Sequence, residues 1–425
     1  MKGKRRVLEA FKTVLIVLLS LSAVYLLLQT PLVEDSGVLE LFSSDPVEHA
    51  QSGKVTLTTA ARPSRIAVSS DGLRYGVQYD QNEADELFAR FGPLLGEALI
   101  SSGEPEEISE GKWQDYLRGQ GIYFDFVGEI PLSALSSWLQ TEGVSSLTAA
   151  ARRILLADGP GDAVLLCYQD MTSNRFYACQ TGLNWTLHLE ADIRSVTGNG
   201  AMFAFEHETL ADLLEPYTLI TEEAEHPIYA VTTPLLPGGN HSALLEALDY
   251  TGRNHASVSG GELYLDGNDR LHVLSGGQVV YSASQPEKYP VATARGMVTV
   301  AEAIEAARRL AEGTVGAQCG EAQLYLISAE PMESGYRIRF GYRLDGSTVW
   351  LYDEGWAAEF YVRDGYITDF TLYFRNYVST GENALLLSMD WAAAVVPNLT
   401  DEHCELNLQY RDQGEDRVEP IWVAK

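Results

Sequence analysis

The chain has 425 residues and a formal net charge of −29, with 59 acidic against 30 basic side chains. Such an acidic surface repels nucleic acid and anionic lipid headgroups, which argues against binding to either. The chain is longer than one hydrophobic core usually covers, and four cysteines are too few for a disulfide-built scaffold, so we expect several domains.

The first apolar run, residues 13–33, contains no charged side chain. A helix of about 20 residues matches a hydrocarbon core of about 30 Å. The run follows a basic tail, residues 1–12, and basic flanks stay in the cytoplasm. We therefore predict a single transmembrane signal anchor in the cell membrane, with the N-terminus inside and the bulk of the chain extracytoplasmic. A cleaved secretion signal is the alternative, although Gln29-Thr30-Pro31 does not resemble a cleavage site.

Small and weakly polar side chains interrupt the leucines of this run. Ser20, Ser22 and Ala23 lie together, with Tyr25 one turn below. Such residues let transmembrane helices approach closely and form hydrogen bonds across the contact. The patch predicts a transmembrane interaction, with simple tethering as the alternative.

The remainder reads as α+β, dominated by antiparallel sheets. We divide it into a juxtamembrane spacer and three domains: 34–54, 55–155, 156–290 and 291–425. The first domain carries a helical repeat of apolar residues over 82–101, which we expect Gly92-Pro93 to break or kink.

A hairpin opens the second domain and holds two of the cysteines. A turn centred on Ser173 would place Cys167 opposite Cys179, at a separation that a disulfide can bridge. Buried reduced thiols remain the default for all four cysteines.

Local signals become clearest toward the C-terminus. Thr299 and Glu302 form a capping box before an apolar helical face that ends at Gly313. Hairpin turns are predicted at Asp266-Gly267, Gly276-Gly277, Asp345-Gly346 and Asp364-Gly365.

The strand 336–344 alternates apolar side chains with Arg337, Arg339, Gly341 and Arg343. The alternation predicts a half-buried strand with a basic outer face. We favour ion pairs between these arginines and acids on neighbouring strands. Docking of an acidic partner on this strand is the alternative.

Catalytic signatures are absent from the sequence: there is no phosphate-binding loop, dinucleotide fingerprint or nucleophile elbow. His207-Glu208 begins like a zinc-protease helix, but Ala211 stands where the second histidine is needed. Asp125 and Glu129 flank a short strand, as a glycosidase pair would, without further support. We predict no enzyme, no cofactor and no metal. An anchored cell-wall hydrolase and a structural or carbohydrate-binding surface protein remain the alternatives.

Short stretches of the chain resemble the YycH family of Gram-positive bacteria, and its C-terminal part resembles the related YycI proteins. The stretches are residues 62–68, 122–131, 406–410 and 419–422. Residues 340–346 are also similar to repeats of sporulation proteins of the YpeB type. The four cysteines and the strong acidity depart from the YycH pattern.

The resemblance implies an anchored, non-enzymatic regulator in a two-component system. Proteins of this family act with a YycI-type protein on the WalK sensor histidine kinase, which controls cell-wall metabolism, through transmembrane and extracytoplasmic contacts. The resemblance implies no catalytic residue and no cofactor, and it leaves open whether the kinase is activated or inhibited.

Overall fold

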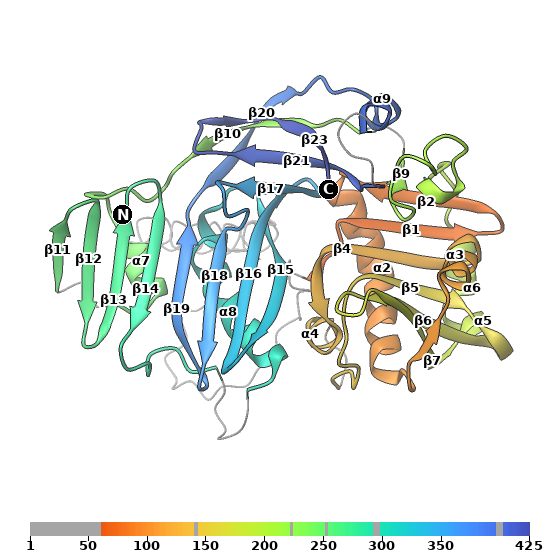
Figure 1. Ribbon diagram of the computed structural model, residues 1–425, viewed down its shortest axis with the longest axis horizontal. Helices are drawn as coiled ribbons and strands as arrows, with labels where there is room; N and C mark the ends of the chain where they lie inside the picture. The colour runs from red at the N-terminus through yellow and green to blue at the C-terminus, as the bar shows by residue number, and fades with distance from the viewer. Residues whose placement is uncertain (1–60, 140–142, 222–223, 251–253, 292–297, 397–402) are drawn as a thin grey trace, which may run out of the picture. The chain divides into compact units, whose positions relative to one another are not determined.

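The computed structural model describes residues 61–139, 143–221, 224–250, 254–291, 298–396 and 403–425 (Figure 1). The chain divides into two units, Met1–Val55 and Thr56–Lys425, and every element below belongs to the second. The predicted anchor, with Ser20, Ser22, Ala23 and Tyr25, and the spacer 34–54 lie outside the described residues. Among the helices that are described, none is long and apolar enough to cross a membrane.

An antiparallel sheet of seven strands, in the order β2-β1-β4-β5-β6-β7-β3, occupies the N-terminal half. Its strands are β1 (Arg65–Ser70), β2 (Leu73–Gln78), β3 (Glu106–Ile108), β4 (Gly121–Pro131), β5 (Ala150–Asp158), β6 (Ala163–Asp170) and β7 (Arg175–Asn184). Side chains alternate between its two faces. In β4, Ile122 and Phe124 join the cluster that contains Phe88, while Tyr123 joins the cluster that contains Trp113. Both faces of the sheet are therefore buried.

Helices cover these two faces. Helix α2 (Gln81–Ser101) and helix α4 (Leu132–Trp138) supply the first cluster, and α3 (Glu110–Arg118) supplies Trp113 and Leu117 to the second. Contrary to the expected break at Gly92-Pro93, α2 is one continuous helix that contains Pro93. Pro93 lies on the exposed side of the helix, as does Ala89, whose carbonyl loses its N–H partner and can bind water.

A second sheet has eleven strands, in the order β11-β12-β13-β14-β19-β18-β16-β17-β21-β23, with β15 paired to β16. Its strands are β11 (His255–Val258), β12 (Gly261–Asp266), β13 (Asp269–Leu274), β14 (Gln278–Ala283), β15 (Gln323–Met332), β16 (Gly335–Leu344), β17 (Ser347–Leu351), β18 (Ala358–Arg363), β19 (Tyr366–Tyr373), β21 (Leu406–Asp412) and β23 (Pro420–Ala424). All pairings are antiparallel except β17 with β21. The fold is thus α+β with predominantly antiparallel sheets, as predicted.

Smaller elements complete the described chain. A three-stranded sheet has the order β20-β10-β22, and β8 pairs with β9. These strands are β8 (Met202–Phe203), β9 (Leu219–Ile220), β10 (Pro227–Thr232), β20 (Asn376–Asn383) and β22 (Arg417–Val418), and the remaining α-helices are α5 (Trp185–His188), α6 (Glu190–Arg194), α7 (Ser242–Ala247), α8 (Val300–Gly313) and α9 (Met389–Val395).

Helix α8 connects the cores of the two large sheets, because it packs against helix α4 of the first sheet. It begins with the predicted capping box, in which Thr299 and Glu302 bond to each other's backbone N–H. Its buried face, which includes Ile304 and Ala307, belongs to the same cluster as the core over the first sheet. The Trp138 indole of α4 donates to the carboxylate of Glu305 at 3.1 Å. One apolar core is therefore continuous across both sheets.

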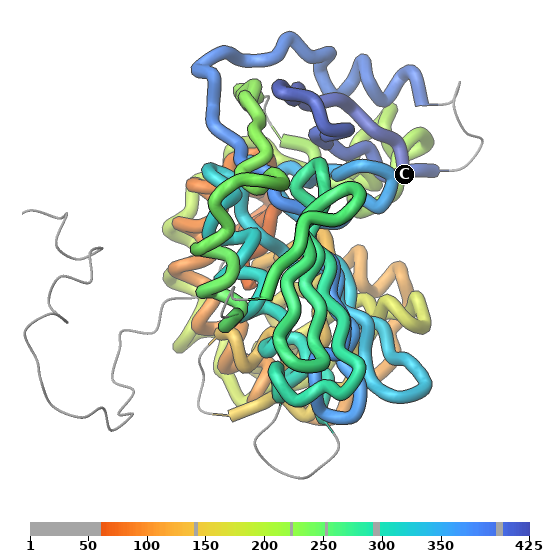
Figure 2. The backbone as a smooth tube through the Cα atoms, turned by 90° about the vertical axis from the view of Figure 1, so that its left-hand side faces the viewer, coloured from red at the N-terminus to blue at the C-terminus, as the bar shows by residue number. Residues whose placement is uncertain are grey.

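Strand pairings cross the domain boundaries that we placed at 155 and 290. The first boundary falls inside β5, which pairs with β6, and β14 pairs with β19 across the second. Figure 2 shows the green strands of residues 255–283 beside the blue strands of the later chain. These boundaries require correction, because the sequence marks each strand but carries no local signal for its partner.

Candidate functional site

The strand with the alternating arginines, for which partner docking was the alternative, carries arginines of two kinds. On β16, Arg339 donates to Glu359 of β18 at 2.8 Å, and Arg337 pairs with Glu330 of β15. These are the ion pairs between neighbouring strands that the alternation favoured.

Arg343 corrects the prediction of a basic outer face, because its side chain is buried. It is 1% exposed and donates to the carbonyl of Arg62 at 2.8 Å and to Gln323 at 3.0 Å. Burial lowers its pKa to about 10. The segment that contains Arg62 covers this end of β16, so Arg343 joins distant parts of the chain and does not face a partner.

The cysteine pair also departs from its prediction. Cys167 lies opposite Ala178, and Cys179 lies opposite Leu166, one residue away from the predicted register. A shift of one residue turns a side chain to the other face of a sheet. The two thiols therefore face different clusters, and all four cysteines are buried and free. Burial raises the pKa of Cys179 to about 11.

A buried ionic cluster links the first sheet to the C-terminal strands. Asp125 of β4 accepts from Arg152 of β5 at 2.8 and 2.9 Å and from Arg65 of β1 at 3.1 Å. Glu405, next to β21, accepts from Arg65 at 2.6 Å and from Arg152 at 2.5 and 2.6 Å. Arg153 binds Glu215 at 2.7 and 2.9 Å and lies 3.6 Å from Glu405. Arg65 and Glu405, which are 340 positions apart in the chain, thus belong to one ionic cluster.

The cluster holds its charges in a closed environment. Asp125 is 0% exposed and Glu405 is 8% exposed. Burial by itself would raise the pKa of both carboxyl groups, but the guanidinium groups of Arg152 and Arg65 outweigh it and hold each pKa below its usual range. Both acids are therefore ionised at neutral pH, and neither is open to a substrate. The ionic cluster holds the first sheet and the C-terminal strands together, and neither of these two acids is accessible as a general acid.

Tyr79, which follows β2, connects this cluster with a surface hollow. The Arg65 guanidinium lies 5.7 Å from the centre of its ring, and its hydroxyl accepts from the N–H of Leu408 at 3.0 Å. Its φ of 59° is rare for an aromatic residue and costs about 1–3 kcal/mol. Gly346 packs against the backbone of Tyr79, where an added Cβ would come within 3.3 Å of its N and Cα atoms. Three parts of the chain therefore meet at this strained residue.

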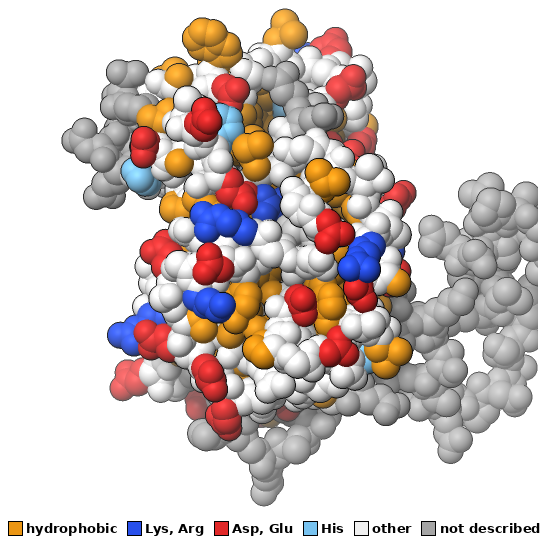
Figure 3. Space-filling model, turned by 90° about the vertical axis from the view of Figure 1, so that its right-hand side faces the viewer, with side chains coloured by type: hydrophobic (Ala, Val, Ile, Leu, Met, Phe, Trp, Pro, Cys, Tyr) orange, Lys and Arg blue, Asp and Glu red, His pale blue; other side chains and the backbone are white. Residues whose placement is uncertain are grey.

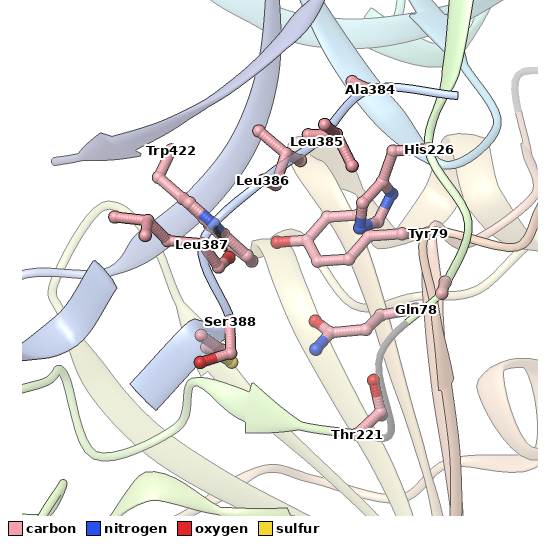
Figure 4. A pocket seen from close by; sticks show the side chains of 12 residues that line it. Gln78, Tyr79, Thr221, His226, Ala384, Leu385, Leu386, Leu387, Ser388 and Trp422 are labelled. Carbon is pink, nitrogen blue, oxygen red and sulfur yellow. Dashed lines mark hydrogen bonds between the residues drawn. The ribbon is translucent and has the colours of Figure 1, made fainter. Parts of the chain in front are cut away.

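The hollow beside Tyr79 has a volume of about 190 Å³. His226 and Trp422 contact the Tyr79 ring edge-on, with centroid distances of 6.0 and 6.1 Å. Figure 4 shows these two rings on either side of Tyr79, with Leu386 near them. The lining residues are Gln78, Tyr79, Thr221, Ala224, His226, Ala384, Leu385, Leu386, Leu387, Ser388, Met389 and Trp422. Burial lowers the pKa of His226, which favours the neutral imidazole.

The lining of this hollow suits binding better than catalysis. Its walls are mainly apolar, and its volume gives room for one large apolar side chain. Among the described residues, no group of three His, Cys, Asp or Glu side chains is placed to hold a metal ion. The sequence offered Asp125 only with Glu129, as acids flanking a short strand, and it gave no signal for Tyr79 or for the approach of Glu405.

Comparison with known proteins supports the fold and adds little at the level of sequence. No family model matches the chain, and no curated protein matches it by sequence. A crystal structure of YycH from Bacillus subtilis superposes with a TM-score of 0.58 at 13% identity, over 87% of this chain and 95% of that one. The chain has a YycH-like fold. At this identity the agreement shows the fold alone, and it extends over nearly the full length of YycH.

Proposed function

We propose that this protein is a membrane-anchored extracytoplasmic regulator of a sensor histidine kinase of the WalK type, acting with a YycI-type protein to control cell-wall metabolism. The observation that carries the proposal is the YycH-like fold, which covers 87% of the chain. In this proposal the predicted anchor at 13–33 lies in the membrane beside the kinase helices and holds the folded region outside the cell.

The buried cluster supports a role through contact and argues against the cell-wall hydrolase. Asp125, which the sequence offered as one of a glycosidase pair, is paired with Arg65 and closed off from solvent, and so is Glu405. A hydrolase needs a carboxyl group within reach of its substrate. Coupling to a kinase needs only that the protein bind one kinase conformation better than another.

Transcription controlled by the kinase tests this proposal. Deleting the gene should change that transcription in one direction, and the full chain should restore it. A chain in which an unrelated spanning helix replaces residues 13–33 should be exported but should restore it only in part, because the transmembrane contacts are lost.

Two results would contradict the proposal. Unchanged transcription after deletion would show that the protein does not regulate the kinase. Full restoration by the chain with the exchanged helix would show that transmembrane contacts are not needed. Turnover of purified wall material by residues 56–425 would instead establish the hydrolase.

A further inference from the structure

A segment near the C-terminus exposes large apolar side chains to solvent. Leu387, Trp391 and Val395 are 60%, 70% and 46% exposed, and Leu385 is fully exposed. We call these four residues the α9 ridge. Trp391 and Val395 lie four residues apart in helix α9, and side chains at this spacing lie on one side of a helix. Leu385 and Leu387 lie in the segment that leads into this helix.

Helix α9 is apolar on both sides. Met389, Ala392 and Ala393 are buried in a cluster with Leu214 and Leu406, while the α9 ridge points away from them. Apart from Asp390, α9 carries only apolar side chains, and a helix that is hydrophobic all round is normally buried on all sides. The exposed side of α9 therefore has the composition of an interface, and exposed apolar patches of this kind mark binding sites.

The hollow beside Tyr79 continues this surface. Residues 384–389, which lead into α9, form one of its walls. The Trp422 indole donates to the carbonyl of Leu387 at 2.8 Å, which fixes this wall to β23. A partner that covers the α9 ridge can therefore also place one apolar side chain in the hollow.

Acidic side chains lie within α9 and beside the segment that leads into it. Asp390 lies in the first turn of α9, and Glu225 accepts from Asn383 at 2.8 Å. No Lys or Arg occurs between residues 376 and 396. The nearby Arg417 is paired with Glu382 at 2.9 Å and with Glu419 at 3.2 Å. Figure 3 shows apolar and acidic side chains together on the upper part of this face of the molecule.

We propose that the α9 ridge binds an amphipathic helix of a partner protein, with large apolar side chains on one face and Lys or Arg along its rim. Trp391 and Val395, one turn apart on α9, can pack into the groove of another helix. The acidic side chains nearby match a basic rim and disfavour an acidic partner. This inference rests on the proposed function in taking the partner to be a protein, but its test uses no kinase, so either can fail without the other.

Binding can be measured with residues 56–425 alone, because this unit is compact and contains its own three apolar clusters. The probe is a fluorescent synthetic peptide whose leucines and lysines follow a helical repeat, and the readout is fluorescence anisotropy. A peptide with glutamate in place of lysine should not bind. The double variant Leu387→Ser, Trp391→Ser should weaken binding more than tenfold, since a central Trp often contributes 2 kcal/mol or more, about 30-fold in Kd.

The matched control is Leu187→Ser in α5, because Leu187 is 76% exposed on a different part of the surface. It should bind the peptide as the unchanged protein does, and all variants should keep the same Tm. Equal binding by the double variant and the control would overturn the proposal. A dimer of residues 56–425 that the double variant dissociates would also overturn it, because the partner would then be a second copy.

Discussion

The buried cluster predicts that Glu405→Gln strongly destabilises the fold. The substitution keeps the size of the side chain and removes its charge. Arg65, Arg152 and Arg153 would then face only Asp125 and Glu215, so one buried positive charge would lose its counter-charge. Removing one member of a buried ion pair costs about 3–5 kcal/mol. Since glutamine still accepts a hydrogen bond, we expect a loss of about 3 kcal/mol in the free energy of unfolding.

The loss should concentrate where the C-terminal strands meet the first sheet. Glu405 forms two backbone hydrogen bonds with Lys425, and its carboxylate ties this strand pair to β1 and β5. Urea unfolding of residues 56–425 gives the free energy, and hydrogen exchange gives its location. The N–H of Leu408, which donates to the Tyr79 hydroxyl, should exchange faster in Glu405→Gln.

The matched control is Glu419→Gln, close in sequence and directly before β23. The side chain of Glu419 is 55% exposed and pairs with Arg417 at the surface. Exposed pairs contribute little, so this variant should unfold as the unchanged protein does. If Glu405→Gln lost no more stability than Glu419→Gln, the cluster would not fasten the two parts of the fold.

Three further predictions concern acid, thiols and a helix cap. The pKa values of Asp125 and Glu405 are lowered in the folded protein. The stability that these two ionised carboxylates contribute is therefore complete above about pH 5 and is lost as the pH falls through their folded pKa values. The urea midpoint should drop steadily below about pH 4, and a midpoint that does not change with pH would contradict this prediction. Without reductant, all four cysteines should be alkylated in denaturant and none in the native protein, whereas protection of two in denaturant would indicate a disulfide. Thr299→Ala removes the cap of α8 and should cost about 1 kcal/mol in urea unfolding, while Thr299→Asp, which retains a cap, should cost much less.

Local patterns fixed individual elements well. The Asp345-Gly346 and Asp364-Gly365 turns both have positive φ at each residue, as this type of hairpin turn requires. The helix over 82–101 and the capped helix of residues 300–313 form where their apolar repeats predicted them. These signals lie within a few residues of one another, so they can be recognised without knowing the rest of the fold.

Local patterns did not predict the register of the paired strands or the segments that pack against them. Cys167 and Cys179 lie in a correctly predicted hairpin, yet a shift of one residue places them on opposite faces. Arg343 continues the alternation of Arg337 and Arg339 but is buried under the segment that contains Arg62. Each outcome depends on which segments pack against the strand, and the sequence of the strand does not specify these segments.

The sequence by itself determined the acidic character of the chain, its apolar first segment, and the type and approximate place of most helices and strands, because these depend on composition and on near neighbours. Only the tertiary structure decided that strands from all the predicted domains share sheets, that Glu405 closes a charge cluster with Arg65, and that Tyr79 joins this cluster to a hollow. The physical reason is that such contacts form between segments hundreds of residues apart, where the gain from burying apolar surface and pairing charges depends on the whole fold.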